Sequence, residues 1–291
     1  MPLPPKKLFH KKESQSCFSD FGISLEEKVK SAITFLQSNE NSAISFNPKG
    51  YWLAFSGGKD SCVILKLAEM SGVRFIPVYN QTTIDPPELV RFIKQEHPNV
   101  QWERPKRNFF VSLYESHGLP TRISRWCCEE YKEHAGDDYV KIIGVRAAES
   151  ARRRVTWKPI TPHRDGKSGD RICPILYWED EDVWCFIRKY KVKYCSLYNE
   201  GFKRLGCVGC PMAGKARVVE FARWPLFEKA WKVAAKKYYN MRKDKISPRG
   251  KPYIGLNKFD TFDDFWNWWM SDNPTKKETK DECLGLFDDS I

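Results

Sequence analysis

The chain has 291 residues, of which 41% are hydrophobic, enough to bury the core of one large domain with a smaller one beside it. Its 49 lysines and arginines exceed its 37 acidic residues, giving a formal net charge of +12. This excess indicates a polyanionic partner such as nucleic acid, or equally a merely basic enzyme. No apolar run approaches the roughly 20 residues of a membrane span, and residues 1–12 lack the apolar stretch of a secretory signal. We therefore expect a cytoplasmic protein that does not bind membranes.

The N-terminal region, residues 1–45, is predicted to be a polar arm followed by a helix. Ser24 followed by Glu27 is typical of a helix start. Apolar positions then recur at helical spacing: Val29, Ile33 and Leu36. Residues 41–50 are expected to form a linker.

Residues 46–195 are predicted to form a nucleotide-binding α/β domain. Short apolar runs alternate with helical patterns, which implies a doubly wound, mostly parallel sheet with flanking helices. Strands are expected at 51–55, 73–79, 100–104, 139–145 and 171–176. Helices are expected at 61–71, 87–96, 108–116, 147–154 and 179–190, with a polar loop at 156–170. Ligands of such sheets bind at the carboxyl ends of the strands, where three segments are expected to meet: 56–61, 80–85 and 144–154.

Residues 196–291 are predicted to form a smaller helical region, rich in cysteine, basic and aromatic residues, with a flexible tail. A long helix is expected at 217–243 with a break near Pro225, and an aromatic helix at 260–270. Its basic residues are candidates to follow a nucleic-acid backbone: Lys215, Arg217, Arg223, Lys229, Lys232, Lys236, Lys237, Arg242 and Lys243. The alternative is a solvated basic helix whose aromatic side chains pack inward.

The run Ser56-Gly57-Gly58-Lys59-Asp60-Ser61 lies between the first predicted strand of the sheet and the following helix. Two glycines let the backbone approach an anion, and the helix N-terminus presents free N–H groups with a partial positive charge. Lys59 adds a cation, and two serine hydroxyls add donors. The run therefore predicts a phosphate-binding loop, with an ordinary glycine turn as the alternative. Its spacing differs from the Walker motif, and it resembles the PP-loop of ATP pyrophosphatases, which cleave ATP between the α- and β-phosphates.

Four cysteines form the second signal: Cys127, Cys128, Cys207 and Cys210. The C-x-x-C pair supplies two thiolates about one turn apart, which is half of a zinc or iron–sulfur site. Adjacent cysteines rarely form an unstrained disulfide with each other, but they can bind one metal centre if the backbone turns. The pattern leaves three interpretations open: an iron–sulfur cluster, a zinc ion, or buried thiols without metal.

Lys132 follows the adjacent cysteines by four residues, and the C-x-x-C pair lies about 80 residues further on. This arrangement resembles the [4Fe–4S] signature of assimilatory adenylylsulfate reductases. The segment from Gly144 through Arg146 to Arg153 is similar to an element of that family near the nucleotide phosphates, and Trp178 to Trp184 resembles another of its segments. Over roughly residues 48–212 the chain is identified as a member of the phosphoadenosine-phosphosulfate (PAPS) reductase family, with an adenine nucleotide α-hydrolase-like fold.

The resemblance implies a [4Fe–4S] cluster on the four cysteines and phosphate contacts from Gly144, Arg146 and Arg153. The intact loop favours ATP with Mg²⁺ as the ligand, with Asp60 near the metal and Asp85 near the base, ribose or metal. An intact loop beside four cysteines also looks like the ATP pyrophosphatase of DNA phosphorothioation systems, and tRNA-thiolating enzymes share this logic. The leading prediction is therefore an iron–sulfur ATP pyrophosphatase in sulfur transfer. It implies DNA or tRNA as acceptor, a cysteine desulfurase as donor, and catalytic roles for Lys59, Asp60, Lys132 and Arg146.

A reductase of adenylylsulfate (APS) or PAPS is the alternative enzyme, with a thioredoxin-type partner. Glu282-Cys283-Leu284-Gly285-Leu286 resembles the Glu-Cys-Gly-Leu-His tail of those reductases, with one extra residue and Phe287 in place of the histidine. Cys283 would then be the nucleophile. A third, non-catalytic prediction is a nucleic-acid-binding module with a structural metal.

Overall fold

The computed structural model describes residues 23–162, 169–246, 250 and 256–271. Its centre is a six-stranded sheet with the strand order β3-β2-β1-β4-β6-β5. Every neighbouring pair of strands is parallel except β5 and β6. The strands are β1 (Tyr51–Ala54), β2 (Phe75–Asn80), β3 (Gln101–Glu103), β4 (Lys141–Ile142), β5 (Ile160–Thr161) and β6 (Arg171–Ile172).

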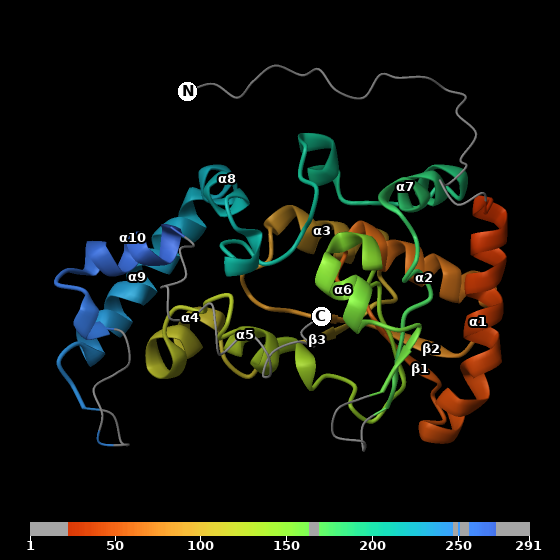
Figure 1. The fold of residues 1–291 in the computed structure, drawn as a ribbon, viewed down its shortest axis with the longest axis horizontal. Coiled ribbons are helices and arrows are strands. Elements are labelled where there is room, and N and C mark those ends of the chain that lie inside the picture. Colours follow the sequence, from red (N-terminus) through yellow and green to blue (C-terminus); the bar gives the residue numbers. More distant parts are fainter. Residues whose placement is uncertain (1–22, 163–168, 247–249, 251–255, 272–291) are drawn as a thin grey trace.

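Helices flank this sheet, and a further group of helices lies beside it (Figure 1). The helices on the sheet side are α1 (Leu25–Phe46), α2 (Lys59–Ser71), α3 (Pro87–Glu96), α5 (Trp126–Cys128), α6 (Ala151–Thr156) and α7 (Asp180–Lys189). The group beside the sheet contains α8 (Ala216–Arg223), α9 (Pro225–Arg242) and α10 (Phe262–Ser271), and α4 (Phe109–Ser112) packs against α9. The predicted fold class, a mostly parallel sheet with flanking helices and a helical C-terminal region, is confirmed.

The strands of the second half of the sheet are shorter than predicted. β6 ends at Ile172 because the chain turns directly after it: Pro174 has no N–H to donate, and the N–H of Leu176 bonds the carbonyl of Cys173 at 3.3 Å. Within the predicted polar loop 156–170, β5 pairs antiparallel with β6 and extends the sheet. The first departure comes from this local turn, and the second from pairing between two segments that the local apolar pattern does not connect.

The N-terminal helix begins as predicted and ends later than predicted. The hydroxyl of Ser24 accepts the N–H of Glu27 at 3.2 Å, and the Glu27 carboxylate accepts the N–H of Ser24 at 2.9 Å. The helix continues to Phe46, so the expected linker at 41–50 was wrong over its first six residues. Ala43 is fully buried on the same stripe as Leu36, and this packing carries the helix through a polar stretch.

The C-terminal helices pack through their aromatic side chains. Trp231 of α9 stacks on Trp269 of α10 with ring centroids 4.9 Å apart and meets Phe109 of α4 at 4.8 Å. These rings belong to the same hydrophobic core as the sheet domain. The predicted break near Pro225 is confirmed, since α8 ends at Arg223 and α9 begins at Pro225. A domain boundary at residue 195 stays a prediction.

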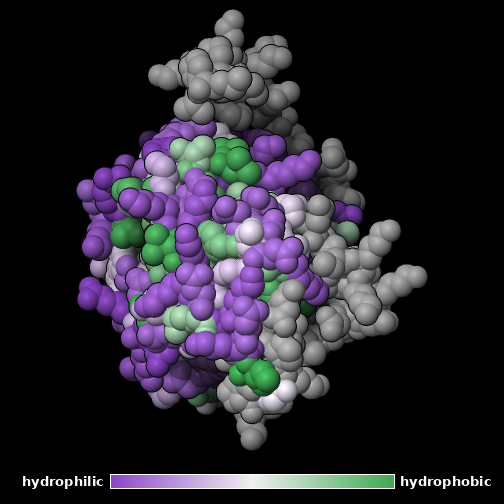
Figure 2. Space-filling view, turned by 90° about the vertical axis from the view of Figure 1, so that its left-hand side faces the viewer, coloured by the Kyte–Doolittle hydropathy of each residue, from purple (hydrophilic) through white to green (hydrophobic). Residues whose placement is uncertain are grey.

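The described residues contain no helix with the length and apolar composition needed to cross a bilayer. The face that the C-terminal helices present is mostly hydrophilic, with scattered apolar residues (Figure 2). Leu226 and Val233 of α9 are two exposed apolar residues of this region.

Candidate functional site

The glycine-rich loop joins β1 to α2, and Gly58 is the N-cap of the helix. Gly57 has a φ of +74°, and a Cβ atom there would lie 2.7 Å from Leu89 and 2.9 Å from Ile93 of α3. Only glycine fits this position, because both the backbone conformation and the space exclude a side chain. The loop therefore packs closely against α3. Within the loop, the hydroxyl of Ser61 donates to the carbonyl of Gly58 at 2.8 Å.

Two cations and two carboxylates form a charge cluster beside the loop: Lys59, Asp60, Arg146 and Asp180. Nζ of Lys59 lies 3.1 Å from Oδ2 of Asp60 and 3.2 Å from Oδ1 of Asp180. The guanidinium of Arg146 donates to Asp60 at 2.6 Å and to Asp180 at 2.7 Å. The Arg146 side chain is only 3% exposed, whereas that of Asp180 is 66% exposed. The cluster thus places two buried cations next to the phosphate loop, with one exposed carboxylate over them.

The pKa values in the cluster follow from this pairing. Burial opposes the charge of Arg146, but Asp60 and Asp180 outweigh it and raise the arginine's pKa. Burial likewise opposes the charge of Asp180, but Lys59 and Arg146 lower its pKa. Arg146 and Asp180 therefore stay charged around neutrality.

The segment after β4 brings Arg146 to the loop. A Cβ atom on Gly144 would lie 3.3 Å from the backbone of Asp60, so glycine lets this segment pass close to the start of α2. Arg153 of α6 forms an ion pair with Glu149, and the Glu149 carboxylate also accepts the N–H of Arg146 at 3.1 Å. Glu149 therefore connects Arg153 to Arg146, and through it to the charge cluster. The roles predicted for Gly144 and Arg153 in nucleotide binding stay predictions.

Asp85 lies on the cysteine side of the site. One of its carboxylate oxygens accepts the hydroxyl of Tyr79 at 2.6 Å and the N–H of Thr82 at 3.0 Å, and the other lies 3.9 Å from Sγ of Cys207. The carboxylate therefore shapes the loop after β2 and faces a thiol. A contact between Asp85 and the nucleotide stays a prediction.

The four cysteines come from two segments that the fold brings together. Cys127 and Cys128 end α5, and a π-helical turn, Glu129–Glu133, follows and carries Lys132. Nζ of Lys132 lies 3.7 Å from Sγ of Cys207. The N–H of Val208 bonds the carbonyl of Ile84 at 2.8 Å, which fixes the C-x-x-C loop against the loop after β2.

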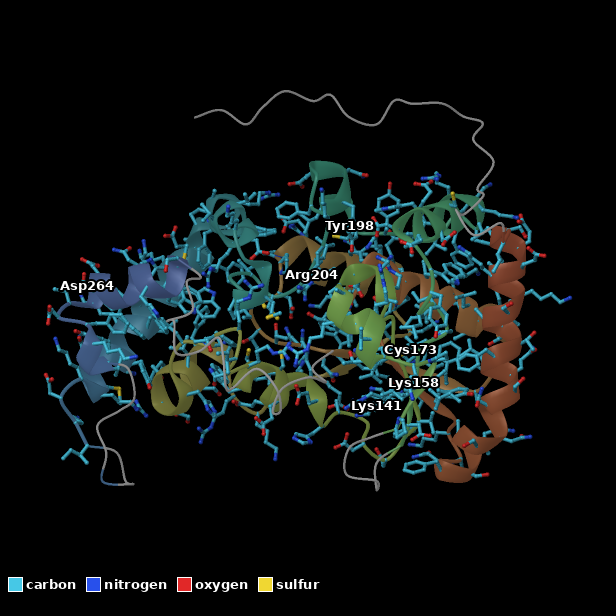
Figure 3. The ribbon with its side chains drawn as sticks, in the orientation of Figure 1. Lys141, Lys158, Cys173, Tyr198, Arg204 and Asp264 are labelled. Atoms are coloured by element: carbon cyan, nitrogen blue, oxygen red, sulfur yellow. The ribbon has the colours of Figure 1, made fainter. Side chains whose placement is uncertain are left out.

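The thiols share one electrostatic environment. A hydrogen bond between Cys127 and Cys128 and burial raise the pKa of Cys127, and the charges of Cys207 and Cys210 raise it further. The same hydrogen bond lowers the pKa of Cys128 to about 6, with help from Lys132 and Arg125. Arg204, labelled in Figure 3, opposes the effect of burial on the pKa of Cys210. Burial outweighs these cations at Cys207 and Cys210 and raises the pKa of both thiols, so Cys128 is the one of the four whose pKa is lowered.

Within the described residues, no group of three or more cysteine, histidine or acidic side chains is arranged to hold a metal ion. The donor set nevertheless fits a thiolate-bound metal centre, since all four thiols are free and cations compensate their charge. In this structure the thiols of Cys127 and Cys128 are free and share a hydrogen bond.

Other predicted residues fall into three groups. Arg217 was expected to be available to a nucleic-acid backbone, and this was wrong: it is 1% exposed and donates to the carbonyl of Trp269 at 2.7 Å. Arg223 pairs with Glu88 and Glu200 at the surface. Cys283 and its neighbours lie outside the described residues. Sequence reasoning assigned no role to Asp180 or Tyr198, although both contact the loop.

The family model described as "Phosphoadenosine phosphosulfate reductase domain" matches residues 50–213, more than half of the chain. An uncharacterised protein of Methanocaldococcus jannaschii is 28% identical over 70% of this chain and 46% of its own length. The adenosine 5'-phosphosulfate reductase of Neisseria meningitidis is 30% identical over 47% of this chain and 60% of its own length. The adenosine 5'-phosphosulfate reductase of Bacillus cereus is 24% identical over 71% of this chain and 91% of its own length.

The chain spans less than half of the length of the first three curated relatives. A crystal structure of PAPS reductase from Candida auris is similar to this chain with a TM-score of 0.45 and 17% identity. The match covers 67% of this chain and 98% of the reductase chain. The extent of the family match, over both the loop and the four cysteines, decides the classification: the chain belongs to the phosphoadenosine phosphosulfate reductase domain family.

Proposed function

We propose that this protein binds ATP at the loop Ser56–Ser61 and cleaves it between the α- and β-phosphates to activate an acceptor for sulfur transfer. The observation that carries the proposal is the pair of buried cations beside an intact loop, Lys59 and Arg146. When ATP is cleaved at this position, negative charge develops on the leaving pyrophosphate. Cations that are already fixed beside the loop can stabilise that charge.

In this mechanism an oxygen of the acceptor attacks the α-phosphorus. The bond from that phosphorus to the bridging oxygen breaks, and pyrophosphate leaves with the electron pair. The loop N–H groups and the hydroxyl of Ser56 hold the leaving group, while Lys59 and Arg146 neutralise its charge. Hydrosulfide, released by a thiol reductant from the persulfide of a donor such as a cysteine desulfurase, then displaces AMP from the activated acceptor and leaves its sulfur there.

Asp60 is the residue that would meet Mg²⁺, since a carboxylate supplies the hard oxygen ligands that this ion prefers, although in this structure its two oxygens pair with Arg146 and Lys59. The ion would supply positive charge that offsets the charge of the phosphates. Asp60 also orients Arg146 and Lys59, so it has a structural role without the metal.

A [4Fe–4S] cluster on Cys127, Cys128, Cys207 and Cys210 is part of the proposal. The free thiols, the neighbouring cations and the backbone turn at the C-x-x-C pair support it. Such a cluster would supply an iron-bound sulfur site. Lys132 is positioned to balance the negative charge of the thiolates. Nucleic acid as the acceptor is supported by the chain's charge of +12.

A second function is favoured by the named relatives, several of which are adenosine 5'-phosphosulfate reductases. In that reaction a thiolate, Cys283 by resemblance, attacks the sulfur of APS or PAPS. The bond from sulfur to the phosphate oxygen breaks, and the nucleotide leaves with the electron pair. A thioredoxin-type dithiol then reduces the S-sulfocysteine and releases sulfite.

The two functions are separated by incubating the anaerobically purified protein with ATP, APS and PAPS in parallel. Pyrophosphate release from ATP in the presence of DNA or tRNA and a sulfur donor is the expected result. Sulfite formation from APS or PAPS with thioredoxin, and no pyrophosphate from ATP with any acceptor, would establish the reductase instead.

A further inference from the structure

We propose that Tyr198 is a phosphate-binding residue, whose hydroxyl accepts the backbone N–H of Lys59 and donates its own proton to a phosphate oxygen of the nucleotide. The inference rests on the proposed function, because it requires phosphate in the loop. Tyr198 lies on the 3₁₀ turn Ser196–Glu200, which follows α7 (Figure 3). It is 139 residues from Lys59 in the sequence, and the fold alone brings the two together.

The position of the hydroxyl is fixed by packing. The ring of Tyr198 meets that of Trp184 edge-on at 5.4 Å and lies 6.3 Å from that of Tyr194. The side chain is buried, and the backbone N–H bonds the carbonyl of Cys195 at 3.2 Å. A ring held on several sides cannot turn away, so its hydroxyl is in place before any ligand arrives.

The hydroxyl has one hydrogen bond and capacity for another. Its oxygen accepts the N–H of Lys59 at 2.8 Å, one of the N–H groups that the first turn of α2 cannot bond internally. A phenol also has a proton to donate. Among the described residues we find no acceptor for it. Burial raises the pKa of Tyr198, so the group keeps this proton at neutral pH. A buried donor left unpaired is costly, and an anion in the loop would pair it.

The hydroxyl also lies where the anion is expected. A Cβ atom built on Gly58 would be 3.5 Å from the Tyr198 hydroxyl and 3.4 Å from Oγ of Ser56, so both oxygens border the same space beside the loop backbone. Oγ of Ser61 lies 3.3 Å from Oγ of Ser56. Three hydroxyls therefore gather at the N-terminus of α2, and the tyrosine is the one supplied from outside the motif.

Tyr198→Phe removes the donor and keeps the ring. Tyr194→Phe is the matched control, because the Tyr194 hydroxyl bonds the side chain of Asn199 at 3.1 Å at the surface. We would measure the affinity of the full-length wild type and both variants for inorganic pyrophosphate, ATP and AMP by calorimetry. Tyr198→Phe is expected to weaken pyrophosphate and ATP binding about tenfold, the scale of one hydrogen bond to a charged group. AMP binding and all affinities of Tyr194→Phe should stay within twofold of wild type.

Each other outcome counts against the inference in a different way. Unchanged pyrophosphate binding in Tyr198→Phe would reduce the hydroxyl to a cap of the helix. Tighter binding would make it a competitor that phosphate must displace. Equal losses for AMP and pyrophosphate would indicate general damage to the fold. A wild type that binds neither ATP nor pyrophosphate would overturn the proposed function itself, which separates that failure from the failure of Tyr198 alone.

Discussion

At the scale of single residues, Asp180 pairs with the two cations that we propose to bind phosphate. Its carboxylate is 66% exposed, yet one of its oxygens contacts both buried cations, Lys59 and Arg146. Incoming phosphate must compete with it for these cations. We therefore expect Asp180→Asn to tighten Mg²⁺-free pyrophosphate binding by about three- to fivefold, the scale of an exposed ion pair.

Glu181→Gln is the control for this effect. It removes the same charge from the first turn of α7, but Glu181 pairs with Arg188 away from the loop. Calorimetric titration should show no gain for this variant. Weaker binding by Asp180→Asn would mean that the carboxylate serves the ligand rather than competing with it.

Lys59 is the residue on which pyrophosphate release should depend most. Its ammonium is buried beside the loop, and its loss would leave Arg146 as the one buried cation of the charge cluster. Lys59→Met should lower the rate of pyrophosphate release about 100-fold, as expected for a fixed donor that stabilises developing charge. Lys66→Met, on the same helix and paired only with Glu69 at the surface, should retain the wild-type rate. Similar rates in both variants would show that the reaction does not use this loop.

At the scale of elements, the turn between β1 and α2 depends on the absence of a side chain at Gly57. Gly72, at the end of the same helix, has a similar φ of +70°, but a Cβ atom there would meet nothing within 4 Å. Gly57→Ala and Gly72→Ala therefore share the backbone strain and differ only in the clash with α3.

The free energy of unfolding should reflect that difference. We expect Gly57→Ala to destabilise the protein by about 2 kcal/mol more than Gly72→Ala, the scale of an overpacked core position. Denaturant unfolding of both variants measures it. Equal losses would mean that α3 can move away from the loop, and the loop would then be less rigid than its packing indicates.

The elements that sequence predicts well are those with local signals. The Ser24 and Glu27 cap, the loop before α2 and the break at Pro225 are each encoded within a few residues, and the structure has all three. The π-helical turn that carries Lys132 has no such signal. The contact of Tyr198 with Lys59 is also invisible in the sequence, since it depends on how the segment after α7 folds back over α2.

At the scale of the whole molecule, the loop after β2 joins the nucleotide side to the cysteines. Thr82 shares a hydrogen bond with Cys207 at 3.4 Å, and Ile84 bonds Val208 at 2.8 Å. The sequence predicted that this loop and the phosphate loop lie at one edge of the sheet, because both follow parallel strands. It did not predict that Asp85 faces the C-x-x-C segment, because the position of that segment depends on how the C-terminal helices pack.

Cys207 therefore offers a test that involves both halves of the protein. If the four thiols hold a cluster, the metal ties α5 to the C-terminal region, and its loss should lower stability as well as iron content. Cys207→Ala, purified anaerobically, is expected to lose bound iron and sulfide and to unfold at a lower temperature. Cys173→Ala removes a buried thiol from a separate part of the core and should keep the wild-type metal content. Removing metal with a chelator should lower the unfolding temperature of the wild type and of Cys173→Ala, but not that of Cys207→Ala. Stoichiometric zinc without iron in the wild type would replace the cluster by a zinc site, and equal metal content in all three proteins would place the metal elsewhere.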